Sequence, residues 1–298
     1  MSDSIELIKQ LRERTGAGLM DCKRALQANE NDIEKSITWL REKGIAKQAN
    51  KASRIAADGL ASVLTEGDKA SIVEINCETD FVARSDAFIQ LVKEINKIAL
   101  DSEANDVEAL KAAKGQDGRT VDTMFTDAGI KIGEKLSLRR VVLVKKNANE
   151  LFGTYLHMGG TMVGLAVVEG KDQAFADEVA MCVVSDNPTY ADVKEVPTAE
   201  LAKEKEVQIE AAKLDPTFAK KPAQIQEKIL DGRVQKHFEN QVLGFQEYVV
   251  DSSKTVGQAM KEHDTIVKSF VRWVVGEGME KRHDDFAAEV AAQAGVAK

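Results

Sequence analysis

Histidine and cysteine, two residues that often carry out chemistry in proteins, are few in this sequence, and their spacing matches no catalytic or metal-binding motif. No two histidines have the HxxxH or HExxH spacing of a zinc site; they are His157, His237, His263 and His283. No CxxC pair is present, so we expect the cysteines to be reduced and small-apolar; they are Cys22, Cys77 and Cys182. The sequence also lacks a GxxxxGK[ST] loop, a GxGxxG loop and a GxSxG elbow. We therefore expect no catalytic residue, no metal site, no cofactor and no enzymatic activity.

One group of adjacent ionisable residues, Glu262, His263 and Asp264, could in principle form a site. Consecutive residues of a helix point in different directions, so these three side chains do not converge. The pattern indicates a solvated helix end.

The segment EINCETDFVARSD, residues 74–86, has a less usual composition. Apolar, β-branched residues around Ile75 predict a strand, which breaks at Thr79-Asp80 with Phe81 and Val82 directly behind. In one interpretation, Thr79 or Asp80 caps a short helix and Phe81 folds back onto the core. In the other, the ring is exposed for a partner.

Composition narrows the class of protein. The chain has 298 residues, 43% hydrophobic and 30% charged, which is enough for two or three globular domains. A net charge of -8 argues against direct binding of nucleic acid and favours a protein partner. No apolar run is long enough to cross a membrane, and residues 1–4 do not resemble a secretory signal, so we expect a cytoplasmic location without membrane contact.

Residues 1–54 are predicted to form a module of three short helices followed by a polar, basic linker. Apolar residues recur at helical spacing in each predicted helix: Ile5, Ile8 and Leu11; Leu19, Cys22 and Leu26; Ile33, Ile37 and Leu40. Asn31 with Glu34 resembles a capping box at the start of the third helix, and Gly44 is expected to end it.

An internal repeat organises the body of the chain, with residues 60–144 resembling residues 154–275. Each copy has a strand-turn-strand pattern, then a helix that begins at an Ala-Phe pair, at Ala87 or Ala174, then a second helix and a strand. The predicted fold class is therefore α+β, a duplicated unit of antiparallel sheet plus helices. The expected subdomains of this core are residues 55–146 and 147–276.

The second copy carries an insertion at about residues 187–253. Thr198 is expected to cap one helix, a second helix follows, and Pro216 and Pro222 lie between them, which predicts a helical hairpin. The hairpin either meets a partner or a second copy of the chain, forming a homodimer, or folds onto its own domain. Residues 277–298 are expected to form a C-terminal helical module.

Two segments resemble the signature sequences of bacterial elongation factor Ts, the nucleotide-exchange factor of the GTPase elongation factor Tu. They are LRERTGAGLMDCKRAL, residues 11–26, and EINCETDFVAR, residues 74–84. The similarity extends to GRVQKHF and VGEGMEKR later in the chain. The sequence departs from the family in LHMGGTMVG, where a Gly-Gly turn replaces a more polar connection, and in a longer segment between residues 101 and 130.

The resemblance implies an N-terminal module like a ubiquitin-associated domain, a two-part core, a hairpin and a C-terminal module. It implies elongation factor Tu as the partner, in its GDP-bound and nucleotide-free states. The Thr-Asp-Phe-Val turn of the family intrudes beside the nucleotide and Mg²⁺ of that GTPase. The partner-binding residues implied for this chain are Thr79, Asp80, Phe81 and Val82 on the turn, Leu19, Met20 and Lys23 in the N-terminal module, and Ile132 and His157 in the core.

Overall fold

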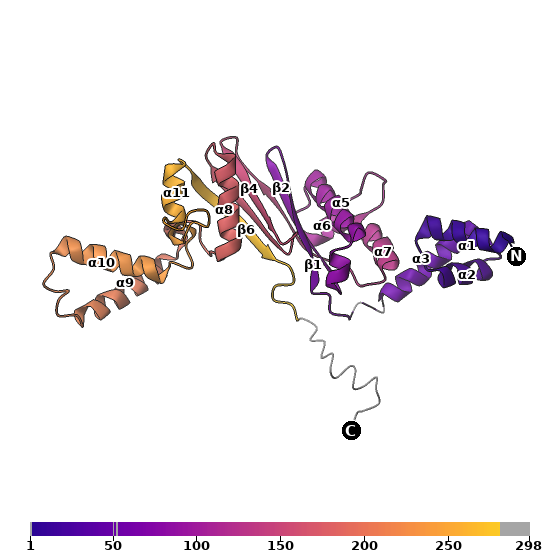
Figure 1. Ribbon diagram of the computed structural model, residues 1–298, viewed down its shortest axis with the longest axis horizontal. Coiled ribbons are helices and arrows are strands. Elements are labelled where there is room, and N and C mark those ends of the chain that lie inside the picture. Colours follow the sequence, from indigo (N-terminus) through magenta and orange to yellow (C-terminus); the bar gives the residue numbers. More distant parts are fainter. Residues whose placement is uncertain (1, 50, 52, 281–298) are drawn as a thin grey trace, which may run out of the picture. The chain divides into compact units, whose positions relative to one another are not determined.

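The computed structural model describes residues 2–49, 51 and 53–280 (Figure 1). These residues fall into two compact units. One contains residues 1–62, 71–143 and 275–298, and the other contains residues 63–70 and 144–274. Within the described residues, no helix has the length and apolar character needed to span a membrane.

Three helices open the chain: α1 (Ser2–Thr15), α2 (Leu19–Ala28) and α3 (Ile33–Ala49). Their shared core contains Leu11, Cys22, Ala25, Leu26 and Leu40. The helix predicted from the spacing of Leu19, Cys22 and Leu26 is present; its buried residues are Cys22, Ala25 and Leu26, and Leu19 is exposed.

Both predicted ends of α3 need correction. The Asp32 carboxylate accepts a hydrogen bond of 2.9 Å from the Lys35 backbone N–H, so Asp32 caps the helix in place of Asn31. The helix then continues past Gly44. A Cβ atom at Gly44 would lie 2.3 Å from Ile130 Cδ1, so glycine is needed there for close packing rather than for ending the helix.

The first sheet has the strand order β1-β2-β3 and is formed by β1 (Asp58–Glu66), β2 (Lys69–Cys77) and β3 (Ser137–Lys145). Between β2 and β3 the chain forms α4 (Asp80–Ala83), α5 (Asp86–Ser102), α6 (Val107–Ala112) and α7 (Val121–Ile132). Side chains of β2 and α5, including Val73, Ile75, Phe88 and Ile95, form the centre of this core.

A buried carboxylate joins three segments of this unit. Glu74 on β2 accepts hydrogen bonds from Arg139 Nη1 (2.8 Å), Arg140 Nε (2.6 Å) and the backbone N–H of Gly276 (2.9 Å). Burial alone would raise the pKa of Glu74, but these donors outweigh burial and hold the pKa below its ordinary value. Gly276, at φ +71, also passes so close to the carbonyl of Ala57 that a Cβ atom would not fit.

The second sheet has the order β4-β5-β6, with β4 (Glu150–His157), β5 (Met162–Glu169) and β6 (Ile266–Val274). Both pairs are antiparallel, and a bulge lies between Val167 and Val168. Helix α8 (Gln173–Asp186) packs across β4 and β5 (Figure 1). The helix approaches closely because Gly153 and Gly164 lie beneath it; a Cβ atom at Gly153 would lie 1.8 Å from the Ala176 carbonyl oxygen.

The predicted duplication is confirmed in the order of elements. In each copy a pair of neighbouring strands is followed by a long helix, a later short helix and a third strand on the edge of the same sheet. The two Ala-Phe pairs have equivalent roles, since Phe88 on α5 and Phe175 on α8 are both buried. The short helices α7 and α11 (Val256–Glu262) are capped by Thr120 and Thr255.

The insertion forms the hairpin of α9 (Thr198–Lys213) and α10 (Ala223–His237). Thr198 is the first helical residue rather than the cap, because Pro197 occupies that position. Leu214, between the two helices, is 85% exposed. Self-association through this hairpin stays a prediction. Most of the expected C-terminal module lies outside the described residues, which end at residue 280.

Candidate functional site

The Thr-Asp-Phe-Val segment is a single helical turn, α4, capped at both ends. Thr79 has extended backbone angles, and its side chain accepts a hydrogen bond of 3.3 Å from the Val82 backbone N–H. At the other end, Ser85 Oγ donates to the Val82 carbonyl at 2.7 Å and accepts from the Phe88 N–H, which starts α5. The two caps fix the backbone of this turn.

Phe81 projects from the capped turn into solvent. Its side chain is 84% exposed, whereas Ala83 is buried and Val82 packs against the core of the first unit. The prediction of a cap at Thr79 is therefore correct, and the alternative in which Phe81 folds back onto the core is wrong. An exposed ring on a fixed backbone is suited to entering an apolar pocket of a partner.

Asp80, beside the ring, is also exposed. It forms an ion pair of 3.0 Å with Arg84, and both side chains are too solvent-accessible for the pair to contribute much stability. The carboxylate therefore remains accessible to a partner. Thus one short turn presents an apolar ring next to a carboxylate.

Ile132 lies at the end of α7, and it packs against the same apolar cluster as Val82. The next residue, Gly133, has φ +83 and reverses the chain. Residues 78–82 and 132–135 therefore come together in space, although they are far apart in sequence. The predicted partner-binding residues in these two segments are Thr79, Asp80, Phe81, Val82 and Ile132.

In the N-terminal module, Leu19 and Met20 open α2 and are 56% and 59% exposed. Lys23, one turn further on, is also exposed. The buried face of α2 is formed by other residues, so these three contribute little to its core. Packing within the module therefore does not explain why two large apolar residues, Leu19 and Met20, are adjacent here.

His157 ends β4 in the second unit and is exposed. Its Nδ1 lies 3.3 Å from the Tyr155 hydroxyl. Two apolar neighbours that the sequence had not singled out are exposed with it, Leu156 and Met158, the latter 75% exposed at a φ of +48. The sequence feature that could have indicated their exposure is the Gly159-Gly160 turn, which follows the end of β4.

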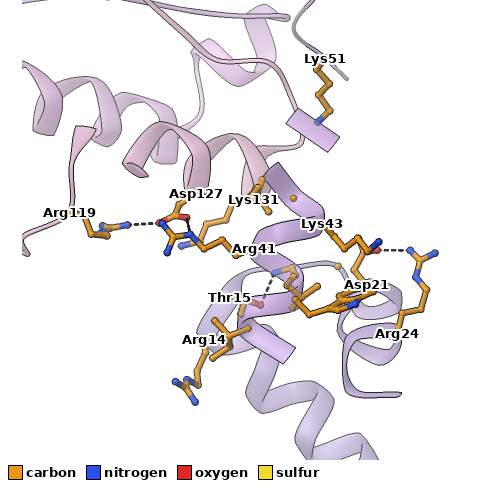
Figure 2. Close-up of a pocket in the computed structure, with 17 residues that line it drawn as sticks. Arg14, Thr15, Asp21, Arg24, Arg41, Lys43, Lys51, Arg119, Asp127 and Lys131 are labelled. Atoms are coloured by element: carbon orange, nitrogen blue, oxygen red, sulfur yellow. Dashed lines mark hydrogen bonds and ion pairs between the residues drawn. The ribbon is translucent and has the colours of Figure 1, made fainter. Parts of the chain in front are cut away.

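A pocket of about 570 Å³ lies among α2, α3 and α7, and it has an apolar base and a basic rim (Figure 2). Its basic side chains are largely engaged within the protein. Arg119 and Arg41 both approach Asp127, at 3.0 and 3.8 Å, and Arg24 pairs with Asp21. Arg41 and Arg119 share this one carboxylate, and the lining contains seven basic residues and two acidic ones, so the rim keeps a surplus of positive charge.

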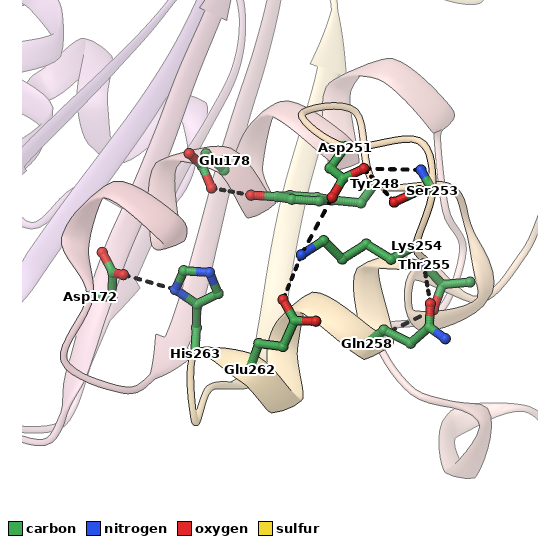
Figure 3. A network of polar contacts seen from close by, with 10 residues as sticks. All are labelled: Asp172, Glu178, Tyr248, Asp251, Ser253, Lys254, Thr255, Gln258, Glu262 and His263. Carbon is green, nitrogen blue, oxygen red and sulfur yellow. Dashed lines mark hydrogen bonds and ion pairs between the residues drawn. The ribbon is translucent and has the colours of Figure 1, made fainter.

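Two members of the Glu262-His263-Asp264 group, Glu262 and His263, belong to a polar network around α8 and α11 (Figure 3). His263 Nδ1 lies 2.9 Å from Asp172 Oδ2, and the imidazole stacks on Phe175 at 4.2 Å. The N–H of Phe175 and His263 together lower the pKa of Asp172. Tyr248 donates to Glu178, and Lys254 bridges Asp251 and Glu262. Tyr248 connects the loop before α11 to α8, and His263 connects the end of α11 to the start of α8. Glu262, His263 and Asp264 are all exposed at the end of α11, so the prediction of a solvated helix end is confirmed.

In the described part of the chain, no group of three or more His, Cys, Asp or Glu side chains is arranged to hold a metal ion. The cysteines Cys22, Cys77 and Cys182 are free and buried, as expected from their spacing. Burial raises the pKa of Cys77 to about 12 and that of Cys182 to about 11, which leaves both as unreactive thiols. The capped turn at Phe81 is thus the best-defined candidate site.

The family model for elongation factor Ts matches residues 78–277, well over half of the chain, so the chain belongs to the elongation factor Ts family. Proteins of this family are nucleotide-exchange factors for elongation factor Tu in translation elongation. The matched region contains the Phe81 turn, Ile132 and His157, and it begins after the N-terminal module.

Proposed function

We propose that this chain accelerates GDP release from elongation factor Tu by inserting the Thr79-Asp80-Phe81-Val82 turn beside the nucleotide and its Mg²⁺. The observation that carries the proposal is the 84% exposure of Phe81 on a turn whose backbone is capped on both sides. A large exposed ring on a fixed backbone gains free energy when a partner buries it. No covalent chemistry is needed for this function.

The mechanism follows from linkage between two ligands of one GTPase. If the factor binds nucleotide-free elongation factor Tu more tightly than the GDP-bound form, it must weaken GDP binding by the same factor. Asp80 acts by its charge close to the metal rather than as a proton donor. Because such exchange occurs wherever elongation factor Tu works, the proposal places the chain in the cytoplasm.

The wedge alone supplies only part of the coupling. Burying one Phe side chain contributes about 1.5 to 3 kcal/mol, or about one to two decades in affinity. The remaining binding energy would come from other exposed surfaces. We assign these to Leu19, Met20 and Lys23 on α2, and to Ile132 and His157 in the core.

The direct test is nucleotide release. Elongation factor Tu loaded with fluorescent GDP is mixed with the chain and excess unlabelled GDP, and the fluorescence decay is followed by stopped flow. We expect the rate to rise with the concentration of the chain and then to saturate. A release rate that does not depend on the chain would contradict the proposal, and stable binding without faster release would instead indicate an adaptor.

A further inference from the structure

The exposed Phe81 ring makes few contacts of its own, so its position depends on the backbone that carries it. That backbone begins at residues 78–79, where β2 has ended and α4 has not yet begun. The caps described above act within the turn. They do not explain how the turn is attached to the rest of the unit.

The attachment is made by Glu134, which follows α7 and is partly buried. Its Oε2 accepts hydrogen bonds from the backbone N–H groups of Glu78 (3.0 Å) and Thr79 (3.1 Å). Its Oε1 accepts from the Thr79 hydroxyl at 2.7 Å. The same hydroxyl oxygen accepts from the Val82 N–H, so the Glu134 carboxylate and the cap of α4 form one continuous chain of hydrogen bonds.

A second carboxylate makes the reciprocal contact, from the segment before α4 to the segment after α7. Glu78 Oε1 accepts a hydrogen bond of 2.6 Å from the backbone N–H of Lys135, and Arg54 Nη1 lies 3.2 Å from both oxygens of Glu78. Two carboxylates therefore join residues 78–79 to residues 134–135. Hydrogen bonds from backbone N–H groups to an ionised carboxylate are among the stronger ones, and two N–H donors on one oxygen define a direction as well as a distance.

We propose that Glu134 is a positioning residue for nucleotide exchange: it holds Thr79, and through the cap of α4 it holds Phe81 in the orientation that enters elongation factor Tu. This inference rests on the proposed function. A carboxylate suits the role because it accepts at both oxygens and faces three donors here, the two N–H groups and the hydroxyl. If the Phe81 turn were mobile in the free factor, it would have to be ordered on binding. The cost of ordering would reduce the coupling between factor binding and GDP release.

The test is a double-mutant cycle of Glu134→Ala and Phe81→Ala. We measure the maximal GDP release rate at saturating factor and, separately, the affinity of each variant for elongation factor Tu. In the wild-type background, Glu134→Ala should lower the maximal rate about tenfold. In the Phe81→Ala background, the same change should lower it by less than about twofold, because the positioned ring is already absent.

Two further variants separate positioning from general damage. Glu134→Gln keeps the shape and one good acceptor, but places an NH₂ group opposite the Thr79 hydroxyl, so we expect a rate between wild type and Glu134→Ala. Glu108→Ala removes an exposed carboxylate of the same unit that pairs with Lys111, and this variant should match wild type. Amide hydrogen exchange of Thr79 in the free factor should accelerate in Glu134→Ala.

The outcomes distinguish this inference from the proposed function. If the wild-type chain leaves GDP release unchanged, the proposed function fails. If the wild-type chain accelerates release and Phe81→Ala slows it, while Glu134→Ala matches wild type or lowers the rate equally in both backgrounds, the positioning role is overturned and the wedge stands. A large loss in wild type that disappears in the Phe81→Ala background supports the role.

Discussion

Phe81 and Phe88 lie on consecutive helices, and only the second belongs to the core. Phe88 is fully buried, so it contributes to the stability of the first unit in the way that apolar side chains usually do. Phe81 loses almost none of its accessible surface in the free protein. In the proposed function, the ring contributes only when elongation factor Tu buries it.

We expect Phe81→Ala to slow GDP release by about one to two decades, the amount expected from burying one Phe in a partner. The free energy of unfolding should change by less than about 0.5 kcal/mol, because an exposed ring packs against little. Leu214→Ala is a matched control, since Leu214 is 85% exposed on the hairpin. A Phe81→Ala variant that releases GDP as fast as wild type would remove the basis of the wedge mechanism.

Glu74 makes the stability of the first unit depend on pH. Its pKa is lowered in the folded protein, so ionised Glu74 stabilises the fold above the pKa of the unfolded chain. This stabilisation is lost as the pH falls through the lower, folded pKa. Glu74→Gln should cost about 3 kcal/mol at neutral pH, because Arg139 and Arg140 lose their shared partner. Urea unfolding at pH 7 and below pH 4 is the measurement, and the difference between wild type and variant should shrink in acid.

At the scale of elements, helix α2 has one buried face and one exposed face. Cys22, Ala25 and Leu26 hold the helix in its module, whereas Leu19 and Met20 face solvent. The combined change Leu19→Ala and Met20→Ala should therefore weaken binding to elongation factor Tu about tenfold or more, with little effect on the melting temperature. Calorimetric titration measures the affinity. Ile5→Ala, at an exposed position of α1, is the control, and equal affinities for all three proteins would refute a role for α2.

Helix α8 depends on glycine in the strands beneath it. Gly153→Ala should destabilise the protein by about 1 to 3 kcal/mol, because the added methyl group meets the Ala176 carbonyl. Gly232→Ala provides a control with the opposite sign: Gly232 lies in α10 with open space around it, so alanine should stabilise by up to about 1 kcal/mol. Chemical denaturation of both variants tests the pair, and an unaffected Gly153→Ala would show that α8 can shift outward freely.

The sequence predicted elements well wherever a local pattern decides them. The strand-turn-strand patterns and the two Ala-Phe pairs indicated both sheets and the repeat. Two kinds of feature left no such pattern in the sequence: the exact residue at which a helix begins, and contacts between distant residues. The choice of Asp32 over Asn31 as a cap depends on the exact start of α3, and Gly44 is explained only by Ile130 across a helix contact.

The candidate site shows the same division. Thr79 and Phe81 were identified from residue types around a strand end and from the family resemblance. Glu134 was missed because its partners are 55 and 56 positions away in the sequence, and nothing in a lone glutamate after a glycine indicates them. Met158 was missed because its 75% exposure follows from the three-dimensional position of the turn after β4, which the residue types alone do not indicate.

At the scale of the whole molecule, the proposed mechanism makes Mg²⁺ an opponent of the factor. If the Asp80-Phe81 turn disturbs the metal beside GDP, factor and Mg²⁺ are negatively coupled ligands of elongation factor Tu. The apparent affinity of the factor for the GDP-bound GTPase should then fall as Mg²⁺ rises. Titrations at several Mg²⁺ concentrations measure this coupling, and Asp80→Asn should reduce it. A constant affinity across the range in which the GTPase fills its metal site would leave only a steric role for the turn.

The bond between Glu74 and the Gly276 N–H has a consequence for the order in which the chain folds during synthesis. The two residues are 202 positions apart, yet Glu74 is buried in the first unit. At about 5 to 20 residues per second, a ribosome needs about 10 to 40 seconds to make the intervening chain. Throughout that interval Glu74 lacks the Gly276 donor, whereas Arg139 and Arg140 are made only 65 and 66 positions after Glu74. We therefore expect that a nascent chain released before residue 276 contains all residues of the first apolar core but leaves Glu74 without its third donor.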